Sequence, residues 1–263
     1  TTYDWYFFPF NDAMPDKSLK TDELYQSVAI GYEATRDPAL LSIDKWQGRT
    51  VLTPDGLMVA RDLAAGKAQP FPFASQFLRD GPRGDMGGLA IMRSGPADTD
   101  QVLVAKNSAM GMGHGHFDKL HWILYDNGHA IVTDYGPARF LNVESKDGGR
   151  YLKENESWAK QTVAHNTLVV NETSNFGGKW RVGDKLAPKQ LFWASTPQAT
   201  VSTAEMTDAY PGVRYRRTLV QLPVDGIESP MIVDLLDVTG DKPATYDLPL
   251  HYAGQITAIG FPL

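Results

Sequence analysis

Residues 123–136 read ILYDNGHAIVTDYG, and this stretch decides the fold class. Asn127-Gly128 separates two apolar runs, which is the favoured sequence for the type I′ turn of a two-residue β-hairpin. The stretch therefore predicts two antiparallel strands that join at this turn. Because such a turn lays the second strand beside the first, Asp134 is expected to return toward His116.

Further short runs rich in Val, Ile, Leu, Tyr and Thr surround this hairpin, and many are bounded by Gly, Asn, Asp or Pro. They predict strands at residues 101–105, 117–125, 129–134, 166–171, 190–195, 198–204, 214–222, 230–238 and 245–252. No strong helical pattern separates these runs. The fold class expected is therefore mainly β, with antiparallel sheets packed as a β-sandwich.

The first part of the chain favours helices. Residues 22–41 carry apolar side chains at helical spacing, with Thr21 or Asp22 as a cap and Asp37-Pro38 as the end. Pro and Gly accumulate in residues 69–88, as they do in connectors. We therefore expect a short helical domain over residues 1–80 and an antiparallel β-sandwich domain, incomplete at its C-terminal end, over residues 81–263.

Composition narrows the classes of partner. With 263 residues, of which 42% are hydrophobic, the chain can bury a sizeable core. Its formal net charge of -6 argues against a nucleic-acid or anionic-membrane surface, and no run approaches the roughly 20 apolar residues of a membrane span. The chain lacks cysteine, so disulfides and thiolate metal sites are excluded. It begins TTYDWYFFPF, without an initiator Met or a signal peptide, and we expect it to be a fragment.

The chemistry is expected around GMGHGHFDKL, residues 111–120. In an extended strand His114 and His116 would share one face. His165 opens another apolar run, and Asp134 returns from the hairpin. Two histidines and one carboxylate suit zinc with water in the fourth position. Each histidine alone is more often an ordinary hydrogen-bonded residue, and that interpretation fits three others best: His121, His129 and His251.

Three segments carry a resemblance to a known family. They read GHGHFDKLHWILYDNGHAIVTDYG (113–136), RYLKENESWAKQTVAHNTLVVNE (150–172) and RTLVQLP (217–223). Together they resemble the heparinase II/III-like region of the exolytic oligoalginate lyases, polysaccharide lyase family seventeen. The resemblance covers essentially the whole chain and implies the end of an (α/α) toroid followed by the sandwich. It also implies Zn2+ held by three residues: His116, Asp134 and His165.

The resemblance assigns the remaining roles in the cleft. His114 and Arg139 would bind the substrate, and Tyr151 with His114 would be catalytic. A lyase removes the proton at C5 of a uronate and breaks the bond to O4, so it needs an acid, a base and a neutralised carboxylate. Arg139 could bind that carboxylate with its fork, and Tyr151 would need nearby cations to ionise near neutral pH. Since the elimination needs no metal-activated water, a structural role for zinc is favoured.

The resemblance also predicts partners. The substrates would be alginate oligosaccharides, and the location periplasmic or secreted, with a homodimer as one assembly to consider. An upstream toroid would supply an Asn-His pair and a further Tyr, which this chain does not contain, so the chain alone is expected to be nearly inactive. Two alternatives stay open: a lyase for another uronate polymer such as a glycosaminoglycan, and a non-catalytic, zinc-stabilised carbohydrate-binding sandwich.

Overall fold

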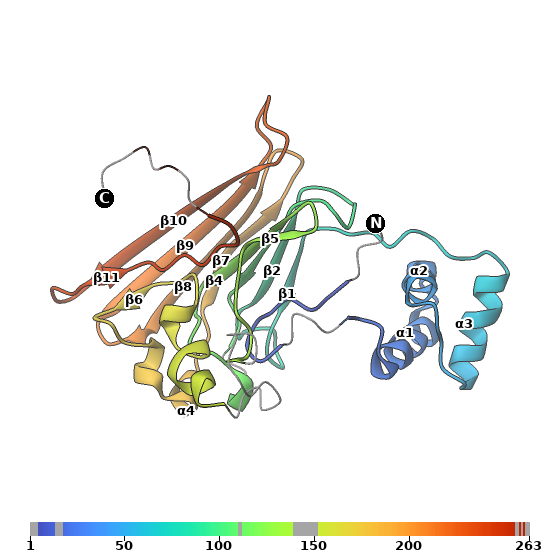
Figure 1. The fold of residues 1–263 in the computed structure, drawn as a ribbon, viewed down its shortest axis with the longest axis horizontal. Helices are drawn as coiled ribbons and strands as arrows, with labels where there is room; N and C mark the ends of the chain where they lie inside the picture. Colours follow the sequence, from blue (N-terminus) through green and yellow to red (C-terminus); the bar gives the residue numbers. More distant parts are fainter. Residues whose placement is uncertain are drawn as a thin grey trace. The chain divides into compact units, whose positions relative to one another are not determined.

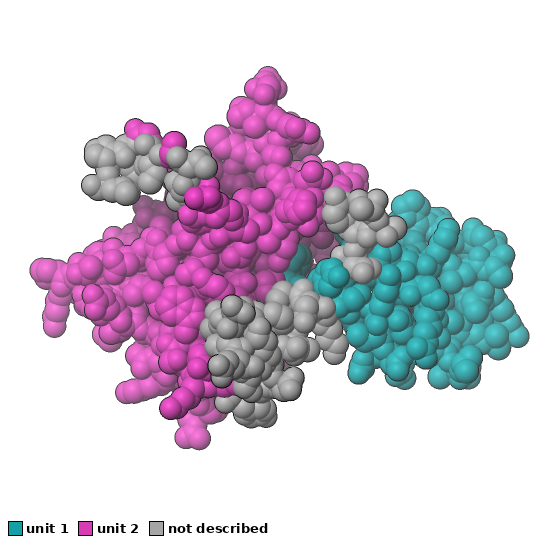
Figure 2. All heavy atoms as spheres, in the orientation of Figure 1, with its two compact units in different colours: residues 1–8, 15–73 teal, residues 9–14, 74–263 magenta. Residues whose placement is uncertain are grey.

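The computed structural model describes residues 5–13, 18–109, 112–138, 152–255, 258 and 260. The chain divides into two compact units, which Figure 2 colours separately. Unit 1 comprises residues 1–8 and 15–73, and unit 2 comprises residues 9–14 and 74–263. None of the described helices is long and apolar enough to cross a lipid bilayer.

Unit 1 contains three helices, α1 Asp22–Thr35, α2 Pro38–Gln47 and α3 Pro54–Ala64. The helical pattern at residues 22–41 spans two of them. Arg36 ends α1 with a left-handed φ of 58°, and the Asp37 side chain then accepts a hydrogen bond from the Ala39 N–H to cap α2. Pro38 begins α2, where its missing N–H costs nothing. The three helices share a small core of Ala29, Tyr32, Leu41 and Val59.

Unit 2 is built on two antiparallel sheets, drawn in Figure 1. The first has the order β1-β2-β3-β4-β5, with β1 Gln76–Arg79, β2 Gly88–Arg93, β3 Val102–Lys106, β4 His121–Asp126 and β5 His129–Val132. The second has the order β10-β9-β8-β7, with β7 Lys189–Ser195, β8 Thr200–Tyr210, β9 Val213–Leu222 and β10 Met231–Gly240. Two short strands, β6 Val169–Val170 and β11 Tyr246–Asp247, pair with each other, and a short helix, α4 Trp180–Gly183, precedes β7.

The two sheets pack face to face. Side chains of β8 and β9 alternate between buried and more exposed positions, as expected of strands with one face in a core. One hydrophobic cluster joins Met92 of β2, Leu103 of β3 and Trp122 of β4 to Leu219 of β9. The predicted mainly β, antiparallel sandwich is confirmed.

The hairpin that decided the fold class forms as predicted. Asp126 pairs with His129, so Asn127 and Gly128 are the two turn residues. Their φ angles are 49° and 74°, the positive values that a type I′ turn requires. The chain leaves β5 after Val132 and reaches Asp134 close to the start of β4.

The other predicted strands differ from the structure at their ends. β1 lies inside the stretch expected to be a connector, since a short edge strand beside Pro and Gly carries little periodic signal, and β2 was not predicted either. The strand expected at 117–125 begins only at His121, because Leu120 adopts a φ of 62°. The strands expected at 166–171 and 245–252 are much shorter in the structure, where only β6 and β11 form. Asn171 and Glu172 directly after β6 adopt positive φ angles.

Candidate metal centre

Three buried side chains from separate segments of unit 2 converge. His116 precedes β4, Asp134 follows β5 and His165 precedes β6, and one ligand atom from each lies within 4.8 Å of the others. Nδ1 of His165 is 3.0 Å from Oδ2 of Asp134. The three side chains that sequence reasoning selected as ligands therefore do meet, although 18 and 31 residues separate them in sequence (134 minus 116, and 165 minus 134).

His121 also belongs to this cluster. It is fully buried at the start of β4, and its Nε2 lies 2.8 Å from Oδ2 of Asp134. Its Nδ1 accepts a hydrogen bond of 2.9 Å from the Asn166 N–H, which fixes the ring. Burial opposes ionisation of Asp134, but His165 and His121 outweigh it and hold the pKa of this carboxyl well below its usual range. Asp134 is therefore an anion in neutral solution.

Asp12 reaches the cluster from the start of the chain. Its Oδ1 lies 3.2 Å from Nε2 of His116 and its Oδ2 lies 3.0 Å from Nδ1 of His114. Asn155 donates to Oδ1 of Asp12 at 3.2 Å. Burial raises the pKa of Asp12, but the hydrogen bond to His116 and its attraction bring it below the usual value. Asn11 adds a second contact, since its Oδ1 accepts the backbone N–H of His116 at 3.1 Å.

The free nitrogens of the cluster fit a metal ion. Among the described residues, Nδ1 of His116 and Nε2 of His165 are buried and have no hydrogen-bond partner. Burial lowers the pKa of His116, so its imidazole is neutral and keeps a lone pair. Unpartnered buried polar atoms are costly, and a cation that takes both lone pairs would remove that cost. The cluster could therefore hold a metal ion.

Buried charges brace the segments that carry the cluster. Lys106, at the end of β3, lies 2.5 Å from Asp118 and donates to Asn11 as well. Arg217 of β9 donates to the carbonyl groups of Leu120 and Asn166, at 2.9 and 2.5 Å, and its fork holds Asp234 of β10. The segments before β4 and before β6 are thus tied to the second sheet, which limits movement of the residues beside His116 and His165.

A family model described as Heparinase II/III-like, C-terminal, matches residues 78–261. The chain belongs to the heparinase II/III-like family. The match covers almost all of unit 2, including every segment that supplies the cluster.

Two curated relatives of this heparinase II/III-like chain match along 99% of its length. One is named alginate lyase, from Stenotrophomonas maltophilia (strain K279a), and is 53% identical over 261 residues. The other is named exo-oligoalginate lyase, from Saccharophagus degradans, and is 50% identical over 260 residues. The chain spans 35% of the length of each.

Solved structures confirm the fold at lower identity. A heparinase III gene product is 15% identical with a TM-score of 0.63, over 96% of this chain and 33% of that one. Heparan sulfate lyase HepC from Pedobacter heparinus is 19% identical with a TM-score of 0.54, over 84% of this chain and 28% of that one. At such identities the likeness shows the sandwich fold alone.

One predicted site residue, His114, lies apart from the buried trio. His114 is 61% exposed and is not one of the three; its Nδ1 lies 3.0 Å from Oδ2 of Asp12. The expectation of an extended strand was wrong, because Met112–His114 forms a single 3-10 turn. Both histidines nevertheless face the same carboxylate. Arg139 and Tyr151 lie outside the described residues.

Sequence reasoning missed four residues of the site. They are Asn11, Asp12, His121 and Asn155. His121 was expected to be an ordinary hydrogen-bonded histidine, and its ring is indeed buried and hydrogen-bonded, but it also lies beside Asp134. One signal was present: Asn11-Asp12 is a polar pair directly after the apolar run FFPF, and Asn11 adopts a left-handed φ of 58°.

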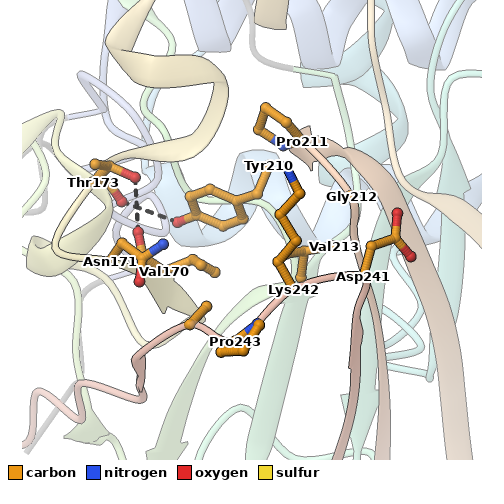
Figure 3. Close-up of a pocket in the computed structure, with 11 residues that line it drawn as sticks. Val170, Asn171, Thr173, Tyr210, Pro211, Gly212, Val213, Asp241, Lys242 and Pro243 are labelled. Carbon is orange, nitrogen blue, oxygen red and sulfur yellow. Dashed lines mark hydrogen bonds between the residues drawn. The ribbon is translucent and has the colours of Figure 1, made fainter.

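A cavity of about 430 Å³ lies elsewhere in the heparinase II/III-like unit, between β6, the β8–β9 turn and the chain after β10 (Figure 3). The Tyr210 hydroxyl donates toward the carbonyl groups of Leu168 and Thr173, at 2.8 and 3.2 Å. Thr173 donates in turn to the carbonyl of Val170. The Tyr210 and Thr173 hydroxyls are thus already paired within the protein, and this cavity contains no histidine among its lining residues.

Proposed function

We propose that this chain carries the sandwich half of a polysaccharide lyase active site that cleaves alginate oligosaccharides by β-elimination. The support is the pair of relatives, 53% and 50% identical over 99% of the chain and named for alginate. Because the chain spans 35% of their length, the complete active site would include an upstream toroid domain. Exolytic release of an unsaturated uronate follows the name of the second relative.

The metal in this proposal is zinc, held by His116, Asp134 and His165. Two neutral imidazoles and one carboxylate form a common donor set for zinc, and thiolate ligands are absent from this chain. Bound zinc would supply positive charge and a fixed coordination geometry at these three residues. The elimination requires no activated water, so the ion would mainly hold three segments together.

His114 is the described residue best placed to meet the sugar. Its ring is exposed and is oriented by Asp12, whose Oδ2 lies 3.0 Å from Nδ1. In the proposed reaction a base takes the proton from C5, the bond from C4 to O4 breaks, and an acid protonates the leaving oxygen. Tyr151 would exchange these protons, while Arg139 and His114 neutralise the uronate carboxylate and so stabilise the charge that develops at C5.

The substrate class follows the closer relatives. Heparinases share the fold at 15–19% sequence identity, which carries no information on substrate. The two relatives named for alginate are 53% and 50% identical to this chain. A glycosaminoglycan lyase is therefore the weaker proposal. A periplasmic or secreted location and a homodimer remain predictions from the resemblance alone.

The test is an assay of the chain within a protein of the relatives' full length, with oligomannuronate as substrate. Formation of the C4–C5 double bond is followed by ultraviolet absorbance. We expect Tyr151→Phe to lower kcat by at least about a hundredfold, the usual contribution of a general acid or base. Tyr246→Phe is the matched control, because Tyr246 is an exposed tyrosine of β11. Unchanged turnover of Tyr151→Phe with intact sugar binding would instead favour the non-catalytic carbohydrate-binding alternative.

A further inference from the structure

A second concave surface lies at the seam of the sandwich, away from the histidine cluster. β1 is an edge strand of the five-stranded sheet and β7 an edge strand of the four-stranded sheet. Between them and the β1–β2 turn lies a groove of about 920 Å³, lined by no residue of the cluster. This volume falls in the range of pockets that hold ligands of a few rings.

The groove is cationic, although the chain as a whole is acidic. Arg79, Arg83 and Lys189 line it, and Asp85 is its one lining carboxylate. Asp85 lies 2.7 Å from Arg83, whereas Arg79 and Lys189 have no ion-pair partner among the described residues. Two cations are therefore uncompensated at one surface of a chain with a net charge of -6. Such a local field favours an anionic ligand.

The backbone of the turn positions Arg79. A Cβ built on Gly84 would lie 3.1 Å from Cδ and 3.3 Å from Cβ of Arg79, so the aliphatic stem packs directly on this glycine. Gly84 also has a φ of +67°, which disfavours any larger residue. Arg79 is thus held at the stem while its guanidinium remains at the groove. A guanidinium fork matches a carboxylate with two parallel hydrogen bonds.

Aromatic side chains line the same groove. Phe77 of β1 and Trp193 of β7 lie with ring centroids 6.1 Å apart, inclined by 33°. A bulge in β7 interrupts the ladder between Gln190 and Phe192, and the Phe192 side chain is 53% exposed. Bulges redirect side chains and occur beside binding sites. Exposed aromatic faces offer a rigid apolar surface for a flat, partly apolar ligand such as a sugar ring.

We propose that the groove between β1 and β7 is a second, non-catalytic subsite for an anionic uronate oligosaccharide. Rings of the sugar would lie on Phe192 and its neighbours, and the carboxylates would pair with Arg79 and Lys189. The inference rests on the proposed function for the choice of polyuronate. The subsite would hold a longer oligosaccharide on the protein while the end of that oligosaccharide reacts at the active site.

The test is calorimetric titration of the 263-residue chain with a mannuronate hexasaccharide, and with cellohexaose as the uncharged probe of equal length. Arg79→Ala and Phe192→Ala remove the two kinds of contact. Arg214→Ala is the matched control, because this arginine of β9 is 54% exposed and lies outside the groove. Thermal unfolding of each variant checks that it is folded.

We expect the hexasaccharide to bind and cellohexaose to bind far more weakly. Each groove variant should weaken binding by about tenfold or more, the usual effect of a lost charge-assisted hydrogen bond or stacked ring, while Arg214→Ala keeps it. No binding, or binding that ignores both groove variants, overturns the proposal. A dimer that Phe192→Ala converts to a monomer also overturns it, because a second copy would then fill the groove.

The proposed function can fail separately. If a hyaluronan hexasaccharide binds with the same dependence on Arg79 and Phe192 and the mannuronate hexasaccharide does not, the groove is a polyuronate subsite and alginate is the wrong substrate. If mannuronate binds in the groove but the Tyr151→Phe enzyme keeps its turnover, the subsite holds and the catalytic assignment fails.

Discussion

Oδ1 of Asp12 lies 3.2 Å from Nε2 of His116, and 104 residues separate the two in sequence. The contact leaves the other ring nitrogen, Nδ1, buried and without a hydrogen-bond partner. A carboxylate behind a ligating histidine sets which nitrogen faces the ion and raises the basicity of the ring. Asp12 therefore acts as a positioning residue for the candidate metal centre.

Asp12→Asn is expected to weaken zinc binding by about 10- to 100-fold, because an amide orients the ring without the negative charge that raises its basicity. The affinity is measured by competition with a coloured chelator. Asp225→Asn serves as the control, since Asp225 is an exposed residue of unit 2. Equal affinities for the two variants would show that Asp12 only fills space beside His116.

His165→Ala should abolish stoichiometric zinc and, with it, the response of thermal stability to chelators. A ligand at about a thousand times its Kd stabilises the folded state by about 4 kcal/mol, so EDTA should lower the unfolding temperature of the native chain clearly. His129→Ala, at an exposed position of β5, should keep both zinc and the EDTA effect. If the His165→Ala variant still binds one zinc per chain, the three proposed ligands are the wrong set.

Arg217→Met is expected to lower the free energy of unfolding by about 3–5 kcal/mol, because it leaves a partly buried carboxylate and two carbonyl groups without their hydrogen-bond donor. The side chain of Arg217 is 3% exposed and its fork contacts both oxygens of Asp234. Arg214→Met removes a more distant pair of 3.7 Å to Glu205 at the surface, and should cost less than about 1 kcal/mol. Urea unfolding of both variants gives the comparison. Similar losses of unfolding free energy in the two variants would rule out a special role for the buried guanidinium of Arg217.

The buried side chain of Lys119 is expected to make the free energy of unfolding depend on pH above neutrality. Burial lowers the pKa of Lys119 to about 7, while in the unfolded chain it lies near its ordinary value of about 10.4. Between these values the unfolded state binds the additional proton, so the free energy of unfolding rises with pH, by at most about 1.4 kcal/mol per unit. The penalty of a buried charge is complete below pH 7 and is relieved as the pH rises.

Lys119→Met removes this titration, and the difference between variant and native chain should therefore change across the window above pH 7. Urea unfolding at several pH values from neutral to alkaline measures it. The Met variant should gain relative to the native chain as the pH falls toward 7 from above. A difference that stays constant across this window would mean that Lys119 titrates alike in both states.

Local patterns predicted the sandwich because they follow from the geometry of single elements. The Asn127-Gly128 turn needs two positive φ angles, and these residue types tolerate them. The alternation along β9 reports one buried face. β1 was missed because a four-residue edge strand offers no period to count. The end expected at Asp37-Pro38 agrees with the break between α1 and α2, although nothing about arginine predicts the left-handed conformation of Arg36.

The metal trio was predicted from a family resemblance, since spacing alone says nothing about contacts across 31 residues. Asp12 and His121 show the remaining gap. A contact over 104 residues depends on the final packing and leaves no mark in local sequence. For His121, the expectation of an ordinary hydrogen-bonded residue agrees with its buried ring, and only the position of Asp134 opposite that ring shows that it borders the trio.

Unit 2 includes residues 9–14, although most of unit 1 follows them in sequence. The chain thus changes unit after residues 8, 14 and 73, which makes the helical bundle an insertion in the covalent order of unit 2. An exchange of halves between homologous genes by one crossover near residue 73 would separate Asp12 from the histidines with which it evolved. A functional chimaera should therefore need a double crossover that carries residues 9–14 along with the sandwich.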